Sequence, residues 1–259
     1  LFFGLYTRTD SHFEGGELQA EGLASGRELE ILKEYQDQLP PRLFSEPPVI
    51  SKFESAADTR KAQRKALKLF SEAGYSFKGG KLLAPEGNQL TIEFLGKSPT
   101  DERIVLPFIE NLRPLGIEAS LRVVDLAQYK NRIDNYDFDI TTLVTSQSLS
   151  PGNEQREYWA SSTADNPGAR NYAGIKNPVV DALVERIVVA SDRSELIALT
   201  KALDRVLRWG FYTIPQWHNP EEWYAWWRKV QFPETQPLYI GIDVWSAWID
   251  TEIEKELGQ

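Results

Sequence analysis

Apolar residues near the middle of the chain follow the pattern of a strand, a helix and a second strand. Residues 90–95 and 117–124 have the short apolar runs of strands, and residues 104–112 repeat apolar positions at helical spacing after a capping Thr100. Two strands joined by a helix at this spacing form a βαβ unit, which is almost always right-handed with parallel strands. The pattern predicts an α/β fold with a mixed, mostly parallel sheet covered by helices.

Elements on either side of this unit extend the prediction. A helix begins at Asp58 or Thr59 and ends at Gly74, and a short hairpin follows it. Residues 127–133 predict a short helix, and residues 136–145 predict a third strand. We expect this third strand to join the sheet of the βαβ unit.

Two amphipathic helices are predicted in the second half of the chain. Asn177 and Pro178 open the first helix, and Asp192 or Ser194 opens the second. Apolar residues recur along one face of each helix, so each has a face to bury. We expect the pair to form a two-helix cover for the sheet.

The two ends of the chain are less regular. Residues 1–56 are rich in turn-forming and helix-breaking residues, which predicts an extended arm that wraps the α/β lobe of residues 57–210. Residues 211–259 begin with a predicted strand over residues 211–217 and hold most of the tryptophans. Their indoles suit a stacking platform for a sugar or base, but a packed contact between lobes is the more common use of such residues. They are Trp217, Trp223, Trp226, Trp227, Trp245 and Trp248.

Composition narrows the possible functions. The chain has 259 residues and a net charge of -9, which disfavours a nucleic-acid partner because such binding depends on clustered Lys and Arg. It has no Cys, which excludes disulfides, thiolate metal sites and a Cys nucleophile, and no apolar run long enough to span a membrane. His12 and His218 lie far apart without nearby carboxylates at ligand spacing, so structural roles are favoured over a metal pair. No cofactor is predicted.

A polar loop after the third predicted strand is the main candidate site. Ligands of open α/β sheets bind at the carboxyl ends of the strands, which is where this loop begins. Its hydroxyls and amides suit holding a polar ligand, although a surface loop whose Ser, Pro and Gly residues only make turns fits the same pattern. The candidate ligand-binding residues are Ser146, Gln147, Ser148, Leu149, Ser150, Asn153 and Glu154, joined by Asn171 and Tyr172 from a turn-rich segment.

Several ordered segments resemble the carboxy-terminal lobe of the family-5 extracellular solute-binding proteins, the peptide-binding receptors of bacterial ABC importers. Residues 5–11, 147–155 and 203–210 are similar to the YejA-like branch of that family. The segments that carry the wider resemblance are Ala73-Gly-Tyr75, Leu90-Thr-Ile-Glu-Phe94, Leu115-Gly-Ile-Glu118, Val124-Asp-Leu-Ala-Gln-Tyr129, Asp137-Phe-Asp139 and Asn177-Pro-Val-Val-Asp-Ala-Leu183.

The resemblance implies one lobe of a periplasmic-binding-protein type II fold. Family members are about twice as long, and two lobes close on an oligopeptide by hinge motion before engaging a permease in the inner membrane. The chain is therefore expected to be a piece of a periplasmic receptor without its amino-terminal lobe, and residues 211–259 are expected to return toward that lobe. Many members hold the peptide's α-ammonium with an Asp on this loop, but residues 144–153 contain none, and Glu154 is the nearest acid.

Two other functions stay open from the residues alone. A secreted hydrolase acting on peptides or glycans needs two carboxylates converging in a cleft. Asp137 and Asp139 lie on one strand face, but such a pair is more often an edge or cap feature. No phosphate loop, zinc signature or nucleophile elbow occurs. The third reading is a protein-interaction module with the Trp-rich segment as its contact surface.

Overall fold

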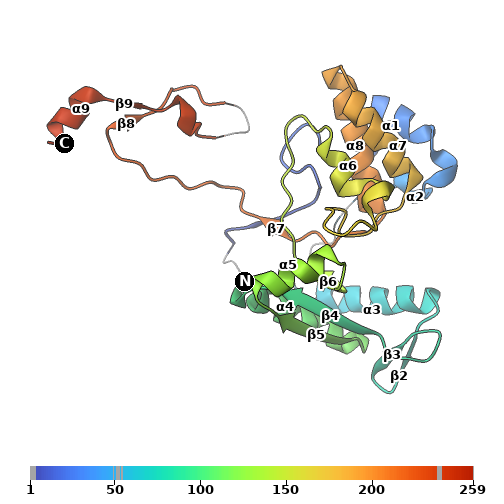
Figure 1. Ribbon diagram of the computed structural model, residues 1–259. Helices are drawn as coiled ribbons and strands as arrows, with labels where there is room; N and C mark the ends of the chain where they lie inside the picture. Colours follow the sequence, from blue (N-terminus) through green and yellow to red (C-terminus); the bar gives the residue numbers. More distant parts are fainter. Residues whose placement is uncertain (1–3, 49, 51–52, 54, 238–240, 259) are drawn as a thin grey trace.

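A three-stranded parallel sheet lies in the first half of the chain. The computed structural model describes residues 4–48, 50, 53, 55–237 and 241–258. Strands β4 (Thr91–Gly96), β5 (Glu118–Val123) and β6 (Ile140–Thr141) pair in the order β5-β4-β6, with both pairs parallel (Figure 1). This confirms the βαβ unit, but β6 is much shorter than the strand predicted over residues 136–145.

Helices α3 (Ala56–Glu72), α4 (Pro99–Leu112) and α5 (Leu126–Asp134) pack around this sheet. From β4, Phe94 packs with residues of α4, and Leu95 packs with residues of α5. Helix α4 is capped two residues earlier than predicted, at Ser98, whose N–H donates to the carboxylate of Asp101 at 2.9 Å. The α/β fold is confirmed.

A hairpin of β2 (Ser76–Lys78) and β3 (Lys81–Leu83) packs against the loop before β5. Gly116 allows this contact, because it has a φ of +77° and a Cβ there would lie 2.6 Å from the Leu82 nitrogen. The N–H of Leu82 donates to the Gly116 carbonyl at 2.9 Å. The glycine thus serves both the turn and the close approach.

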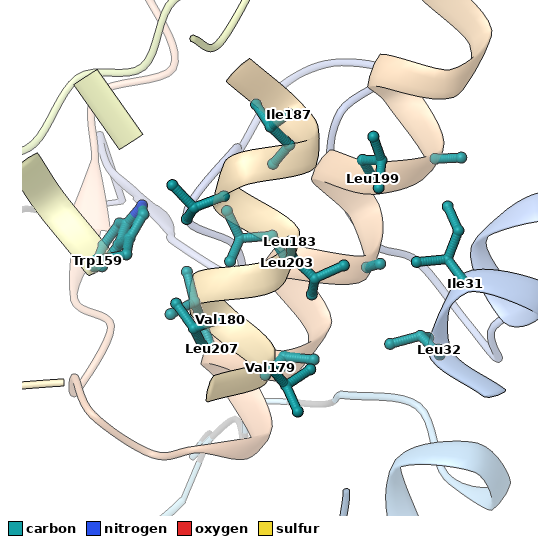
Figure 2. Close-up of a cluster of buried hydrophobic side chains, with 14 of the residues drawn as sticks. Ile31, Leu32, Trp159, Val179, Val180, Leu183, Ile187, Leu199, Leu203 and Leu207 are labelled. Carbon is teal, nitrogen blue, oxygen red and sulfur yellow. The ribbon is translucent and has the colours of Figure 1, made fainter. Parts of the chain in front are cut away.

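A separate helical body holds the largest apolar core. It contains α1 (Gly26–Lys33), α2 (Arg42–Ser45), α6 (Glu154–Trp159), α7 (Pro178–Val189) and α8 (Arg193–Trp209), which lie together in Figure 1. Figure 2 shows how Leu183 of α7, Leu203 of α8 and Ile31 of α1 meet in this core. Asn177 caps α7 as predicted, and of the two alternatives for α8 Asp192 is the cap; each accepts hydrogen bonds from two backbone N–H groups.

The prediction that α7 and α8 cover the sheet is wrong. Their buried faces pack against each other, α1 and Trp159 of α6, and no residue of β4, β5 or β6 belongs to this core. The amphipathic pattern showed that each helix buries one face, but it could not show which surface that face meets. The sheet is covered instead by α3, α4 and α5.

Residues 10–48 are more ordered than the irregular arm predicted. Helix α1 was missed, and the segment before it is held by charged groups of α8. The buried Asp204 carboxylate accepts from the Ser11 hydroxyl at 2.9 Å and the Ala20 N–H at 3.0 Å. Arg205, also buried, pairs with Glu28 at 2.6 Å. Buried charges need such partners, so this segment is a fixed part of the helical body.

The carboxy-terminal segment extends away from the other elements (Figure 1). Of the strand predicted over residues 211–217, only Trp217 is in a strand, β7 (Trp217–His218), which pairs antiparallel with β1 (Thr7–Arg8). Beyond it, β8 (Val230–Gln231) pairs with β9 (Trp248–Ile249), followed by α9 (Thr251–Glu256). The short 3-10 helices are η1 (Gln36–Gln38), η2 (Arg113–Leu115), η3 (Ser161–Thr163) and η4 (Val244–Ser246).

Candidate functional site

The candidate loop, residues 146–154, lies in the segment that runs from the carboxyl end of β6 to the helical body. Its middle lies against the segment 13–18, with which Gln147, Ser148 and Leu149 enclose a small cavity. Arg193 at the start of α8 donates to the Leu149 carbonyl at 2.5 Å and also pairs with Glu17. The loop therefore joins the sheet to the helical body instead of lying along the sheet edge.

A chain of hydrogen bonds orders the far half of the loop. The indole N–H of Trp159 donates to Oε1 of Gln155 at 2.9 Å, and Nε2 of Gln155 donates to Oε1 of Gln147 at 2.7 Å. Gln155 and Trp159 are buried and lie one turn apart on α6. These two hydrogen bonds connect the buried residues of α6 to the partly exposed Gln147.

Glu154 is held within the loop. Burial acts to raise the pKa of its carboxyl, but hydrogen bonds from the backbone N–H groups of Gly152 and Glu154 and from the Gln155 amide outweigh it, so the pKa is lowered. Gly152 N–H donates at 2.9 Å to the same oxygen that accepts from Gln155 at 3.1 Å. The carboxylate is therefore ionised near neutral pH and already engaged on one oxygen.

The other predicted site residues separate into exposed and interior positions. Ser146, Ser148, Leu149, Ser150 and Asn153 are exposed, although the Ser148 hydroxyl accepts from Ser150 N–H and the Asn153 side chain accepts from Arg156. Most of the loop therefore remains open to a ligand.

The side chains of Asn171 and Tyr172 contact other residues of this chain. Asn171 is fully buried, and its amide bonds the Ala160 carbonyl and both backbone groups of Ile175. The predicted ligand contact by Asn171 is therefore wrong, because no part of its amide faces solvent. Tyr172 packs beside Leu95 and the helix α5 residues of that cluster.

The acidic pair Asp137 and Asp139 makes contacts with neighbouring residues. Asp137 pairs with Arg132 at 2.9 Å, and the Asp139 carboxylate accepts from the Glu93 N–H at 2.8 Å, as an edge feature does. With Glu93 and Arg132 they line an open polar cavity of about 340 Å³. Over the described ranges, no three acidic or His side chains gather as metal ligands.

The two histidines make separate contacts. His12 packs edge-on against Trp159, with ring centroids 5.1 Å apart, and His218 bonds the Thr9 hydroxyl at 3.1 Å. Neither arrangement resembles a metal site.

Among the described helices, none has the length and apolar character to cross a membrane.

Gln155 and Arg193 were not predicted from the sequence as site residues, although both hold the loop in place. An amide and an indole four residues apart on a helix lie on the same face, so the Gln155–Trp159 pair was a usable signal. Arg193 had no comparable signal, because its partners Glu17 and Leu149 are distant in sequence. Contacts of that kind depend on the tertiary fold.

The fold of this chain is similar to that of a solved binding protein. The fold resembles the oligopeptide-binding protein AppA from Bacillus subtilis, solved with a nonapeptide, with a TM-score of 0.56 and 19% identity over 87% of this chain and 45% of that one. A parallel α/β sheet beside a helical body, with a polar loop joining them, is thus part of a periplasmic binding-protein fold. At this identity the likeness concerns the fold alone.

The model of the bacterial extracellular solute-binding proteins, family 5 (middle region), matches residues 31–167, and the chain belongs to this family. It is 44% identical over 252 residues to the probable peptide-binding protein YejA of Agrobacterium fabrum, covering 96% of this chain and 40% of that protein. It is 33% identical over 252 residues to the peptidoglycan-binding protein YepA of the same organism, covering 97% and 41%. The chain thus spans about 40% of the length of these curated relatives.

Family membership also settles the choice between a binding protein and an enzyme. The family is one of binding proteins, so the hydrolase alternative is set aside. Similarity to YejA-like binding proteins, expected from the sequence motifs, is confirmed.

Proposed function

We propose that this chain is the carboxy-terminal lobe of the substrate-binding component of an ABC importer that captures oligopeptides or peptide-like solutes. The observation that carries the proposal is the exposed polar loop 146–154, which follows a parallel strand in a member of a solute-binding family. Its hydroxyls, amides and carbonyls can satisfy a peptide backbone without reading side chains. The names of the two relatives, which refer to peptides and peptidoglycan, support the same ligand class.

The ligand would lie between this lobe and a second one outside the chain. Residues 57–210 form the lobe in this proposal, residues 10–48 are fixed to its helical body, and residues 211–259 return to the second lobe. The pairing of β1 with β7 supports this arrangement, because it brings the incoming and outgoing segments side by side. Trp223, Trp227 and Trp245 support it too, since their largely exposed indoles offer apolar surface for a contact.

An importer role implies a partner and a place. The receptor works in the periplasm and delivers its ligand to an ABC permease in the inner membrane. Closure of the two lobes on a peptide is the change that the permease would recognise. The net charge of -9 is consistent with a small-molecule or peptide ligand and disfavours nucleic acid.

Native mass spectrometry of the full-length protein tests the proposal. The protein is incubated with a mixed pool of four- to eight-residue peptides, and the bound mass is then measured. We expect intact peptides to remain bound at a stoichiometry of one per protein. Recovery of shortened peptides would indicate a hydrolase, and recovery of no peptide from this pool would contradict the proposed ligand class.

A further inference from the structure

The direction of the hydrogen-bond chain at the loop is fixed by its first member. An indole N–H can only donate, so the Gln155 atom facing Trp159 must be the oxygen. The Gln155 nitrogen then faces Gln147, and the Gln147 atom that receives its hydrogen bond must in turn be an oxygen. The amide nitrogen of Gln147 is therefore directed away from this chain of bonds.

That nitrogen is buried without an acceptor among the described residues. A buried donor without a partner is unfavourable, and native proteins keep few of them except where a ligand or water completes the bond. Gln147 also lines the small cavity between the loop and residues 13–18. The unused donor thus belongs to a residue of the cavity wall.

The cavity has the dimensions and surface of a small-residue subsite. Its volume is about 80 Å³, several times the ~10–15 Å³ that one water molecule needs by this measure. Phe13 and Leu18 give it apolar walls, while Gly15 and Gly16 add no side chain. The space between these walls favours a small side chain over a large aromatic or aliphatic one.

The charges around the cavity favour a neutral acceptor. Glu14 accepts from the N–H groups of Asp10 and Ser11, and Glu17 is paired with Arg193. Two carboxylates and one guanidinium leave a net negative wall, which disfavours the carboxylate of a ligand. A peptide carbonyl accepts a hydrogen bond without carrying charge.

We propose that this cavity is a subsite for one small residue of a bound peptide, whose main-chain carbonyl accepts a hydrogen bond from Nε2 of Gln147. Gln147 is then a ligand-binding residue, held in orientation by Gln155 and Trp159, and the cavity walls set the preference for a small residue. The inference rests on the proposed peptide-binding function and adds to it a preference for a small residue at one position. A polar loop alone does not predict that preference.

Gln147→Glu is the sharpest variant, because it keeps an oxygen for the Gln155 amide and replaces the free donor with an acceptor. The probes are pentaalanine and five pentaalanine peptides in which each position in turn carries Phe. Binding to the full-length protein is measured by calorimetry for the parent, Gln147→Glu and Gln147→Ala. Gln128→Glu, the same change at an exposed position of α5, is the control for added charge.

We expect Gln147→Ala to weaken pentaalanine binding about three- to tenfold, as the loss of one hydrogen bond does, and Gln147→Glu to weaken it more. Gln128→Glu should bind like the parent, and one of the Phe-containing peptides should bind at least tenfold more weakly than the others. Thermal unfolding of each variant verifies that it is folded.

The outcomes separate the two proposals. If the parent and Gln147→Glu bind these peptides equally well, the peptide makes no hydrogen bond with Nε2 of Gln147. The subsite proposal is then wrong, but the proposed peptide-binding function is retained. Equal affinity for all five Phe-containing peptides would also refute the subsite. If the parent binds none of the six peptides, the proposed function fails with it.

Discussion

The helical body and the carboxy-terminal segment use large apolar residues in opposite ways. In the helical body, residues such as Leu183 and Leu203 recur at helical spacing and are fully buried. In the segment after β7, Trp223 and Trp227 lie four residues apart but in no helix, and both are largely exposed, as is Trp245, to 93%. The apolar faces of these helices are therefore buried within this chain, whereas these three indoles remain largely exposed. Their exposure supports the proposal of a second lobe.

The largest effect should come from the helical body. Leu203→Ala should lower the free energy of unfolding of the chain by about 2–5 kcal/mol, because it removes buried methyl groups and leaves a cavity. Leu126→Ala is the matched control, since Leu126 is 70% exposed, and its effect should stay within about 0.5 kcal/mol. Urea unfolding measures both, and similar values for the two variants would contradict the difference in packing.

A smaller, pH-dependent effect on the unfolding free energy should come from His12, at the edge of the helical body. Burial lowers the pKa of His12 from its ordinary value of 6.5, and Arg208 adds to this, while Asp204 opposes it. Below pH 6.5 the unfolded chain takes up a proton that folded His12 does not, so the unfolding free energy falls as the pH drops toward the folded pKa.

Parallel urea titrations of the parent and His12→Phe measure this dependence, because the variant keeps a ring beside Trp159 and cannot titrate. We expect the difference between them to be constant above pH 7 and to change below pH 6.5 in the direction that penalises the parent. A difference that does not vary with pH would show that His12 titrates alike in the folded and unfolded chains.

The smallest effect is expected in the carboxy-terminal segment. Trp245→Ala should change the unfolding free energy of this chain by less than about 0.5 kcal/mol, because an exposed side chain loses little contact. The comparison becomes sharper in the full-length protein, where the same variant should be destabilising if a second lobe covers this indole. Acrylamide quenching of tryptophan fluorescence provides the second readout, and equal quenching in both forms would oppose the two-lobe proposal.

Local features of the fold were predictable, but its long-range contacts were not. Asn177 and Asp192 act through neighbouring N–H groups, so their capping roles can be read from short sequence windows. The partner of an amphipathic face is set by the whole fold, which is why the expected two-helix cover of the sheet was wrong. Helix α1 was missed because its stability depends on contacts such as the Arg205–Glu28 pair, 177 positions apart.

The candidate site follows the same division. The loop 146–154 could be found because it is a polar segment after a strand. Asn171 was misassigned because an Asn in a turn-rich segment looks the same whether its amide meets a ligand or, as here, the backbone of Ile175. The cavity beside Gln147 could not be predicted, since its opposite wall comes from residues 13–18.

The pairing of β1 with β7 has a consequence for protein engineering. Thr7 lies opposite His218, and the Thr9 N–H donates to the Gln216 carbonyl at 3.2 Å, so the two boundaries of the intervening 9–216 segment are neighbours. A segment whose ends meet can be moved as a cassette, because a host chain needs only a short gap to receive it. Lobes from related receptors could be exchanged at this one pair of strands to make chimaeras.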